Sequence, residues 1–207
     1  ADELVLFSND IPLAQKRITA EVCVHHLFFD ADDYATLGAR IKWNPAVKDK
    51  RHKPELLKAL LNGTLDVIAT DHAPHTLEEK ANHYMKCPGG APLVQHSLQL
   101  MLYFYHKGAI TLEQIAEKMS HNVATCFQMK ERGFIREGYF ADLFLLDTQL
   151  LHTVTKDNLL YKCGWSPLEG KTFKGRVTNT WVNGNLVFEN GNLIEGSNGK
   201  RLLFNRN

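Results

Sequence analysis

The order of short apolar runs and helix-like stretches constrains the fold of this chain more than any other feature. Between residues 18 and 65 the two kinds of segment alternate, which is the pattern of successive β/α units and predicts a parallel sheet. A predicted helix over residues 53–61 is stopped by Asn62 and Gly63 before the last of these runs. We expect three strands, at residues 18–23, 39–43 and 65–70.

Helical signals continue beyond the third expected strand. Apolar residues recur at helical spacing over residues 92–107, and this amphipathic helix would end at Gly108. Thr111, with Gln114 three residues later, forms a capping box that opens another helix. Residues 30–37, between the first two strands, are expected to form a short helix or a turn.

Past residue 137 the character of the chain changes. Asn183-Gly184 is the strongest short signal for a β-hairpin, and it is flanked by the apolar segments 177–182 and 186–188. We therefore expect an α/β region over residues 1–137 and a small β element over residues 138–207.

Composition and charge exclude several functional classes. The chain has 207 residues, and 24 Lys and Arg against 23 Asp and Glu leave a formal net charge of +1. That balance provides no field to attract nucleic acid or an anionic membrane. The longest apolar stretch, residues 98–105, is far shorter than a membrane-spanning helix. We expect a soluble protein with neither nucleic-acid nor membrane partners.

Two further features favour a cytoplasmic location. The four cysteines have no paired spacing, which fits reduced thiols better than disulfides or a four-cysteine zinc site. The chain begins Ala1-Asp2-Glu3, with no basic region and no methionine, so we expect neither a signal peptide nor a natural start.

Polar residues capable of chemistry directly follow each of the three expected strands. His25 comes after the first strand, Asn44 after the second and Asp71 after the third. In a parallel barrel or open sheet, the carboxyl ends of the strands meet at one face, where active sites are built. The sequence therefore predicts that these three strand ends meet at a single pocket.

Asp71 is the most informative of these residues. A carboxylate directly after a buried strand is costly to desolvate unless a cation or several donors meet it. With histidines from neighbouring strands, it matches the ligand set of catalytic zinc, which keeps an open position for water. Alternatively, Asp71 caps the following segment, and His72 and His75 are polar loop residues. The spacing alone leaves both interpretations open.

The other candidate residues have structural alternatives as well. Successive side chains of an extended segment point to opposite faces, so at most one of His25 and His26 would be a ligand. The alternative is a core histidine bonded to a backbone carbonyl. Asn44 either positions a polar substrate or ends a strand. The loop of residues 87–92 lacks the spacing of a phosphate-binding fingerprint, so it forms either a wall of the pocket or a turn.

Three segments strongly resemble the dihydroorotases of the cyclic amidohydrolase group. They are Thr19-Ala20-Glu21-Val22-Cys23-Val24-His25-His26, Asn44-Pro45-Ala46-Val47-Lys48 and Ile68-Ala69-Thr70-Asp71-His72-Ala73-Pro74-His75. Residues 138–147 and 180–187 are similar to the small β element that closes amidohydrolase chains. The resemblance runs nearly from end to end of the chain.

The resemblance implies a (β/α)8 barrel, of which this chain is the C-terminal part, with two zinc ions that share a carboxylated lysine and a hydroxide. Such a centre opens the cyclic amide of dihydroorotate, or closes N-carbamoyl-aspartate, in pyrimidine biosynthesis. By position, His25 matches a metal ligand, and Asp71 matches the aspartate that binds metal and shuttles the proton. The matched substrate-binding positions are Asn44, His75, Gly90, Ala91 and Pro92.

The chain departs from the family pattern at several positions. Val24 stands where a proline is common, and Ala46 and Lys48 replace the usual proline and arginine, but none of these changes removes a ligand. The His-x-His pair, the lysine to be carboxylated and a further strand-end histidine have no match in the chain. We therefore expect a C-terminal portion that pairs with a complementary N-terminal half.

Two alternatives stay open on the sequence alone. A hydantoinase- or allantoinase-like cyclic amidohydrolase would share these motifs, and a catalytically inactive dihydroorotase-like subunit would serve as a scaffold. Retention of Asp71, His25, Asn44 and His75 argues against decay. The sequence also leaves open the metal's identity, the number of ions and whether the protein forms a homo-oligomer.

Overall fold

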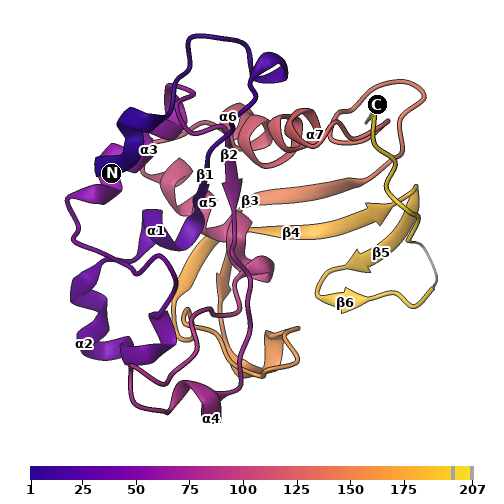
Figure 1. The fold of residues 1–207 in the computed structure, drawn as a ribbon. Coiled ribbons are helices and arrows are strands. Elements are labelled where there is room, and N and C mark those ends of the chain that lie inside the picture. The colour runs from indigo at the N-terminus through magenta and orange to yellow at the C-terminus, as the bar shows by residue number, and fades with distance from the viewer. Residues whose placement is uncertain (197–198, 206–207) are drawn as a thin grey trace.

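The computed structural model describes residues 1–196 and 199–205, and within them the strands form two sheets (Figure 1). A parallel sheet joins β1 (Glu21–Cys23) to β2 (Val67–Ala69), and a four-stranded antiparallel sheet has the order β3-β4-β5-β6. The strands of the second sheet are β3 (Leu143–Thr153), β4 (Thr172–Val182), β5 (Asn185–Glu189) and β6 (Asn192–Leu193).

Helical segments make up most of the remaining regular structure. Before β1 lie the 3-10 helices η1 (Asp2–Leu6) and η2 (Leu13–Gln15). Between β1 and β2 lie α1 (Val24–Phe28), η3 (Ala31–Asp33), α2 (Tyr34–Leu37), η4 (Gly38–Ile41) and α3 (His52–Leu61). After β2 come α4 (Leu77–Lys80), η5 (Val94–His96), α5 (Ser97–His106), α6 (Leu112–Ala116), the π-helical η6 (Glu117–His121), α7 (Asn122–Cys126) and, between β3 and β4, η7 (Lys156–Asn158). Among the described residues, none of these helices has the length and apolar character needed to span a membrane.

The parallel pair is the α/β part of the fold. Val22 lies opposite Ile68 in the ladder, and both side chains are buried. Parallel neighbours need a crossover connection, and the helical segments from α1 to α3 provide it. The helix expected over residues 53–61 is confirmed as α3, which begins one residue earlier.

The middle strand expected at residues 39–43 is wrong. Most of that segment forms η4, and β1 pairs directly with β2, so no ladder position between them is left for another strand. Ile41 and Trp43 are fully buried, which accounts for the alternating pattern that suggested a strand. Alternation of apolar and polar residues shows only that burial alternates along the segment. The backbone hydrogen bonds here are not those of a sheet, since the Lys42 carbonyl accepts the N–H of Gly90, in a distant loop, at 2.8 Å.

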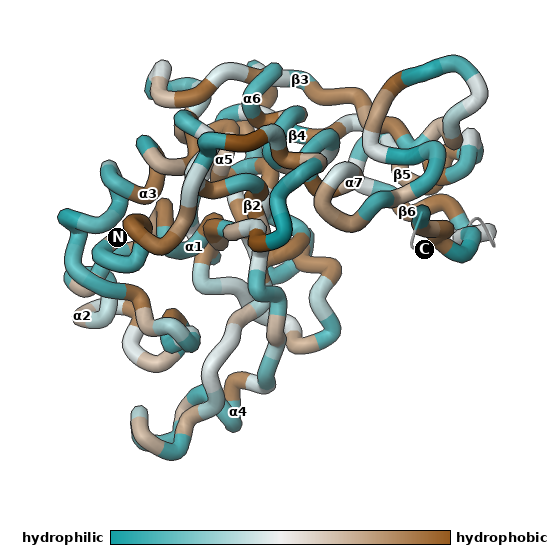
Figure 2. Tube along the Cα trace, turned by 45° about the horizontal axis from the view of Figure 1, so that its top comes forward, coloured by the Kyte–Doolittle hydropathy of each residue, from teal (hydrophilic) through white to brown (hydrophobic). Residues whose placement is uncertain are grey.

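Helix α5 packs against both parts of the fold, contacting α1 on one side and β4 on the other (Figure 1). Gly175 in β4 permits the close approach, because a Cβ there would lie 2.6 Å from Leu102 Cδ1. Leu100, Met101 and Leu102 are fully buried in consequence. Figure 2 shows hydrophobic stretches around α5, β2 and β4, where the core lies.

Local signals in the sequence are reproduced closely. The Thr111 side chain accepts the Gln114 N–H, and the Gln114 side chain accepts the Thr111 N–H, so the capping box is confirmed. The hairpin between β4 and β5 is also confirmed, and Asn183 and Gly184 have φ values of 51° and 82°. Both central residues of a type I′ turn need a positive φ, which asparagine and glycine adopt most easily. The helix expected over residues 92–107 starts later, at Ser97.

Arg132 ties the antiparallel sheet to the segment before it. Its buried guanidinium pairs with Asp142, donates to Asn183 Oδ1 at 2.7 Å and lies over the Phe140 ring. Asp142 also accepts the Asn183 N–H at 2.7 Å, so the turn of the hairpin is held as well. The division into residues 1–137 and 138–207 stays a prediction.

The connection between β3 and β4 is anchored on Tyr161. Its hydroxyl accepts the Gln95 N–H at 3.0 Å and bonds to His96 Nδ1 at 3.0 Å. Burial, with a smaller contribution from His152, lowers the pKa of His96 to about 4. His96 is fully buried and therefore stays neutral in the folded protein at neutral pH.

This burial predicts a pH dependence of stability. As pH falls from 6.5 to 4, unfolded His96 takes up a proton that the folded state does not, so stability decreases by about 3 kcal/mol. His96→Gln should make this part of the profile less steep, with the contribution of the buried His25 remaining, whereas the exposed His106→Gln should leave the slope unchanged. Urea denaturation between pH 7 and pH 4 measures both, and an unaltered slope in His96→Gln would contradict the assignment.

An ion pair between Lys16 and Asp66 lies just before β2. Lys16 Nζ is 2.6 Å from Asp66 Oδ1, and each side chain is 5% exposed. The other carboxylate oxygen accepts the Ala20 N–H at 2.9 Å, and Lys16 also donates to the Gly63 carbonyl at 3.1 Å. The ammonium group and the carboxylate thus have two partners each.

Asp66→Ala should lower the free energy of unfolding by about 3–5 kcal/mol, because it leaves the Lys16 ammonium buried without its counter-ion. Asp32→Ala is the matched control: it removes an exposed pair with Lys50 at 3.5 Å and should cost less than about 1 kcal/mol. Equilibrium urea denaturation compares the two variants. Equal losses would show that burial does not set the strength of the Lys16 pair.

Candidate metal and substrate site

The carboxyl ends of β1 and β2 lie side by side, because Cys23 and Ala69 are opposite each other in the parallel ladder. Helix α1 begins directly after β1, and residues 70–75 follow β2, so both segments start from the same edge. The expected meeting of these two strand ends is therefore confirmed. This edge is the candidate site.

His25 lies in α1, not in an extended segment, and it is fully buried. Its ring stacks on Trp43, with the centroids 4.0 Å apart and the planes 7° from parallel. Burial, with a smaller contribution from His26, lowers the pKa of His25 to about 2, so the imidazole is neutral. Neither ring nitrogen has a hydrogen bond of good geometry among the described residues, but the backbone of Thr70 still acts on the ring as a hydrogen-bond partner that favours its protonated form. The alternative of a core histidine bonded to a backbone carbonyl therefore stays open.

Cys23 and His26 join His25 in one cluster. One ligand atom from each of the three residues lies within 4.8 Å of the others. The expectation that only one histidine could be a ligand assumed an extended segment. That assumption is wrong, because both histidines lie in α1 and their ring centroids are 4.1 Å apart. Sequence reasoning missed Cys23, although it stands two residues before His25. Burial, reinforced by the carboxylates of Glu21 and Asp71, raises the pKa of this thiol to about 12.

Asp71 lies close to this cluster, since its charge acts on both Cys23 and His26. The side chain is exposed, and the residue has a φ of 46°, which is unusual outside glycine. The alternative in which Asp71 caps the next segment is wrong, because Thr76 is the N-cap of α4 and accepts the Glu79 N–H. The catalytic and metal-binding roles of Asp71 stay predictions.

Asn44 is exposed and lies against the loop of residues 87–92, which we call the glycine loop. A Cβ on Gly89 would lie 2.8 Å from Asn44 Nδ2. Gly90 has a φ of 116°, and a Cβ there would lie 2.5 Å from the Ala73 carbonyl oxygen. Ala91 forms an isolated parallel bridge with His72. The glycine loop therefore packs directly on the segment that follows β2.

Two lysines that the sequence analysis passed over hold the glycine loop in place. Lys80 is buried and donates to the carbonyls of Gly90 at 2.8 Å and Pro88 at 3.0 Å. Lys42 donates to the carbonyls of Tyr84 and Cys87, both at 2.6 Å. Burial lowers the pKa of Lys80. No local motif marks either lysine, because their partners are backbone carbonyls that any residue supplies.

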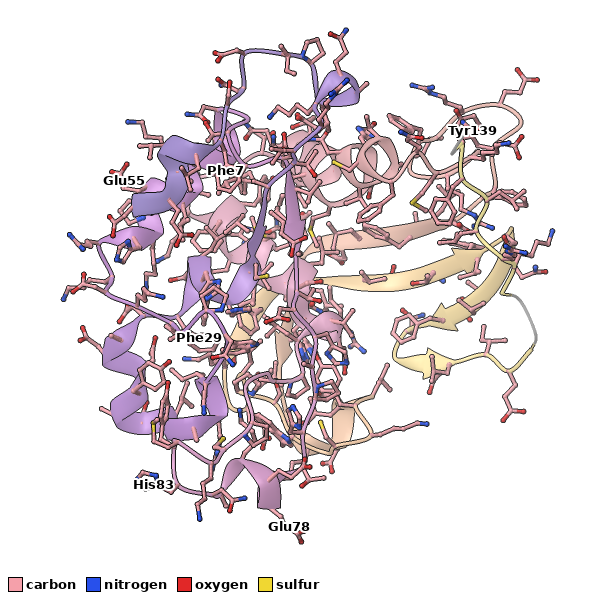
Figure 3. All side chains as sticks on the ribbon, in the orientation of Figure 1. Phe7, Phe29, Glu55, Glu78, His83 and Tyr139 are labelled. Atoms are coloured by element: carbon pink, nitrogen blue, oxygen red, sulfur yellow. The ribbon has the colours of Figure 1, made fainter. Side chains whose placement is uncertain are left out.

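The two histidines after Asp71 have different surroundings. His72 Nδ1 accepts the Leu93 N–H at 3.0 Å, which places the proton of a neutral ring on Nε2. His75 Nδ1 is 3.4 Å from Glu79, and the His75 carbonyl accepts the Trp165 indole N–H at 2.7 Å. The substrate-binding role of His75 stays a prediction. His83 is exposed at the periphery near α4 (Figure 3).

The donors at this edge fit a metal ion. The His25 ring is fully buried and neutral, and one nitrogen of a neutral imidazole is unprotonated, which is the form that metals bind. A carboxylate and a thiol lie nearby, and both are common ligands of transition metals. A bound cation would take that unprotonated nitrogen as a ligand.

Gly90→Ala should lower the free energy of unfolding by about 1–3 kcal/mol more than Gly108→Ala, because only the first change drives a methyl group into the Ala73 carbonyl. Both glycines have a positive φ, but the φ of 69° at Gly108 lies at the left-handed region that alanine can adopt, whereas the φ of 116° at Gly90 lies outside it, so backbone strain adds to the steric loss at Gly90. Gly108 also faces open space. Urea denaturation measures the difference. Equal losses of unfolding free energy in the two variants would mean that the glycine loop shifts to accommodate the added methyl group.

Comparisons with known proteins agree with this arrangement. The profile of the amidohydrolase family matches residues 13–187. A dihydroorotase from Halobacterium salinarum is 37% identical over 152 residues, which is 73% of this chain and 36% of that protein. A dihydroorotase from Anoxybacillus flavithermus is 36% identical over 176 residues, 84% of this chain and 41% of the relative. The chain thus spans about two fifths of the length of the curated relatives it matches.

Solved structures of similar fold are hydantoinases and dihydropyrimidinases. The L-hydantoinase (dihydropyrimidinase) from Arthrobacter aurescens superposes with a TM-score of 0.83 at 27% identity, covering 94% of this chain and 44% of that one. The dihydropyrimidinase from Brevibacillus agri has a TM-score of 0.78 at 24% identity, covering 85% of this chain and 40% of that one. The second likeness concerns the fold alone.

Proposed function

This chain belongs to the amidohydrolase family, and we propose that it is part of a dihydroorotase, which interconverts dihydroorotate and N-carbamoyl-aspartate in pyrimidine biosynthesis. The observation that supports this most is the placement of His25 and Asp71 after two directly paired parallel strands. The identity of over a third to dihydroorotases along most of the chain supports the choice of substrate.

The parallel pair is, in this proposal, one part of a (β/α)8 barrel that the rest of a longer polypeptide completes. Such barrels typically need about 250 residues. Two short paired strands with a helical crossover are compatible with an arc of that barrel, which residues 1–137 would supply. Residues 138–207 would form the small β element. We therefore propose the complementary N-terminal half as the partner of this chain. We place the assembled enzyme in the cytoplasm.

The proposed cofactor is zinc, with two ions in the complete enzyme. His25 and Asp71 would hold metal from this chain, and the carboxylated lysine would come from the other half. The buried, neutral imidazole of His25, whose unprotonated nitrogen can bind a metal, supports this assignment. The chemistry supplied by such a metal would be polarisation of the amide carbonyl and a lowered pKa of the attacking water.

The residues of this chain would bind the substrate and move one proton. Hydrolysis adds water across the ring C–N bond, so a proton leaves the water and arrives at the departing nitrogen. Asp71 would accept and deliver that proton, which its exposed place at the strand edge permits. Asn44, His75 and the backbone at Gly90, Ala91 and Pro92 would orient the cyclic amide, since the glycine loop packs against Asn44 and against the segment that follows β2.

A hydantoinase-like activity is the second candidate, favoured by the fold similarity to the Arthrobacter enzyme. Turnover of dihydroorotate compared with turnover of hydantoin and dihydrouracil, in the complete protein, distinguishes the two. Higher kcat/KM for hydantoin would replace the first proposal with the second. Loss of all three activities in a metal-loaded protein would favour an inactive subunit.

Asp71→Ala in the complete protein should reduce kcat for dihydroorotate at least about 100-fold, because Asp71 is the residue proposed to carry the proton from the water to the departing nitrogen. The fold should persist, since the side chain is exposed. Asp157→Ala, an exposed acidic residue in η7, is the control and should retain full activity. Steady-state kinetics with circular dichroism on each variant provide the measurement, and normal turnover in Asp71→Ala would overturn the mechanism.

A further inference from the structure

His75 is held by two side chains from different parts of the chain, and each of them contacts a different atom of it. The His75 carbonyl accepts the indole N–H of Trp165, 90 residues further along the sequence, at 2.7 Å. The ring nitrogen Nδ1 lies 3.4 Å from Oε2 of Glu79 in α4. The proposed function gives His75 a substrate-binding role and gives none to Trp165 or Glu79.

We propose that Glu79 and Trp165 are positioning residues for His75: the carboxylate orients the imidazole, and the indole fixes the backbone. The contact with Glu79 occupies Nδ1 and leaves Nε2 for the cyclic amide, and the His75 side chain is 30% exposed, so a substrate can reach it. The inference rests on the proposed function, because it needs His75 at the substrate. It adds the two residues that determine where that imidazole lies.

The orientation by Glu79 follows from the N-terminal cap of α4. Glu79 Oε2 accepts the Thr76 N–H at 2.8 Å, and Thr76 Oγ1 accepts the Glu79 N–H at 3.2 Å, so the capping box holds this carboxylate in place. The Thr76 N–H, with a smaller contribution from His75, lowers the pKa of Glu79, so the carboxylate is ionised at neutral pH. Because a carboxylate can only accept, its contact with His75 favours a proton on Nδ1, and the partner of one ring nitrogen sets the role of the other.

Trp165 is a fixed donor because the segment around it is buried. Trp165 and Leu168 are almost wholly inaccessible to solvent, and the Gly170 N–H donates to the Val154 carbonyl at 2.9 Å, which closes this segment against the end of β3. A buried indole N–H without an acceptor is costly, so the bond to the His75 carbonyl stabilises the indole as well as the segment after β2. The connection between β3 and β4 thereby reaches the candidate site through one hydrogen bond.

Glu79→Gln separates the capping role of Glu79 from its effect on His75. Glutamine can close the capping box, as Gln114 does at the start of α6, but its neutral amide is a weaker acceptor for the imidazole. In the complete protein, KM for dihydroorotate should rise at least about fivefold, with kcat within about twofold of the wild type, because the substrate loses a binding contact. The free energy of unfolding should not change. Glu78→Gln, an exposed neighbour at the periphery of the molecule (Figure 3), is the matched control and should retain the wild-type KM.

Trp165→Phe keeps an aromatic ring and removes the indole donor, so KM should again rise at least about fivefold with little change in kcat. Trp181→Phe, in β4, is the matched control and should leave KM unchanged. Each variant is then repeated in a His75→Ala background. If Trp165 and Glu79 act through His75, neither change should raise KM further there, whereas a general loosening of the structure would raise KM in both backgrounds.

The outcomes separate this inference from the proposed function. If His75→Ala raises KM and the other two changes multiply that increase, the positioning roles are wrong and the proposed function stands. A wild-type KM in His75→Ala would overturn the substrate role of His75 and this inference with it. Should Trp165→Phe not fold, as judged by circular dichroism, the exposed Glu79→Gln still decides, because a wild-type KM in that variant would overturn the inference.

Discussion

The direct pairing of β1 with β2 is the constraint on which the candidate site depends. Because Cys23 lies opposite Ala69, His25 and Asp71 each follow within two residues of the same edge. A register slip of one residue would reverse the faces of a strand and take Val22 out of the core, so the burial that stabilises the pair also sets the site. The packing of β1 on β2 therefore also sets the positions of the candidate site residues.

Two lysine ammonium groups provide the second constraint, and they donate to backbone carbonyls of the glycine loop. Lys80 reaches the carbonyls of Pro88 and Gly90, and Lys42 reaches those of Tyr84 and Cys87, so the glycine loop is held from both ends. Hydrogen bonds from charged donors are stronger than neutral ones. A loop fixed in this way presents its remaining N–H and C=O groups without further ordering, which is what a substrate-orienting backbone requires.

Features that depend on neighbours in the chain were predicted well from the sequence. The capping box at Thr111, helix α3 and the hairpin at Asn183-Gly184 each follow from residues a few positions apart. The prediction of a strand at residues 39–43 failed because the alternation of Ile41 and Trp43 records burial without a ladder, and Trp43 is buried by stacking on His25. The extended geometry assumed for His25 failed because α1 begins directly after Cys23.

The amino-acid sequence alone established the available chemistry. It contains the histidine, asparagine and aspartate motifs, and their resemblance to a known family can be read without a structure. The tertiary structure determined which polar side chains are buried and which of them come into contact. The burial of the His25 ring, the approach of Cys23 to both imidazoles and the hydrogen bond from Lys80 to Gly90 all depend on distances in space. Such distances follow from the packing of a strand end, a helical turn and a distant loop, which no local pattern encodes.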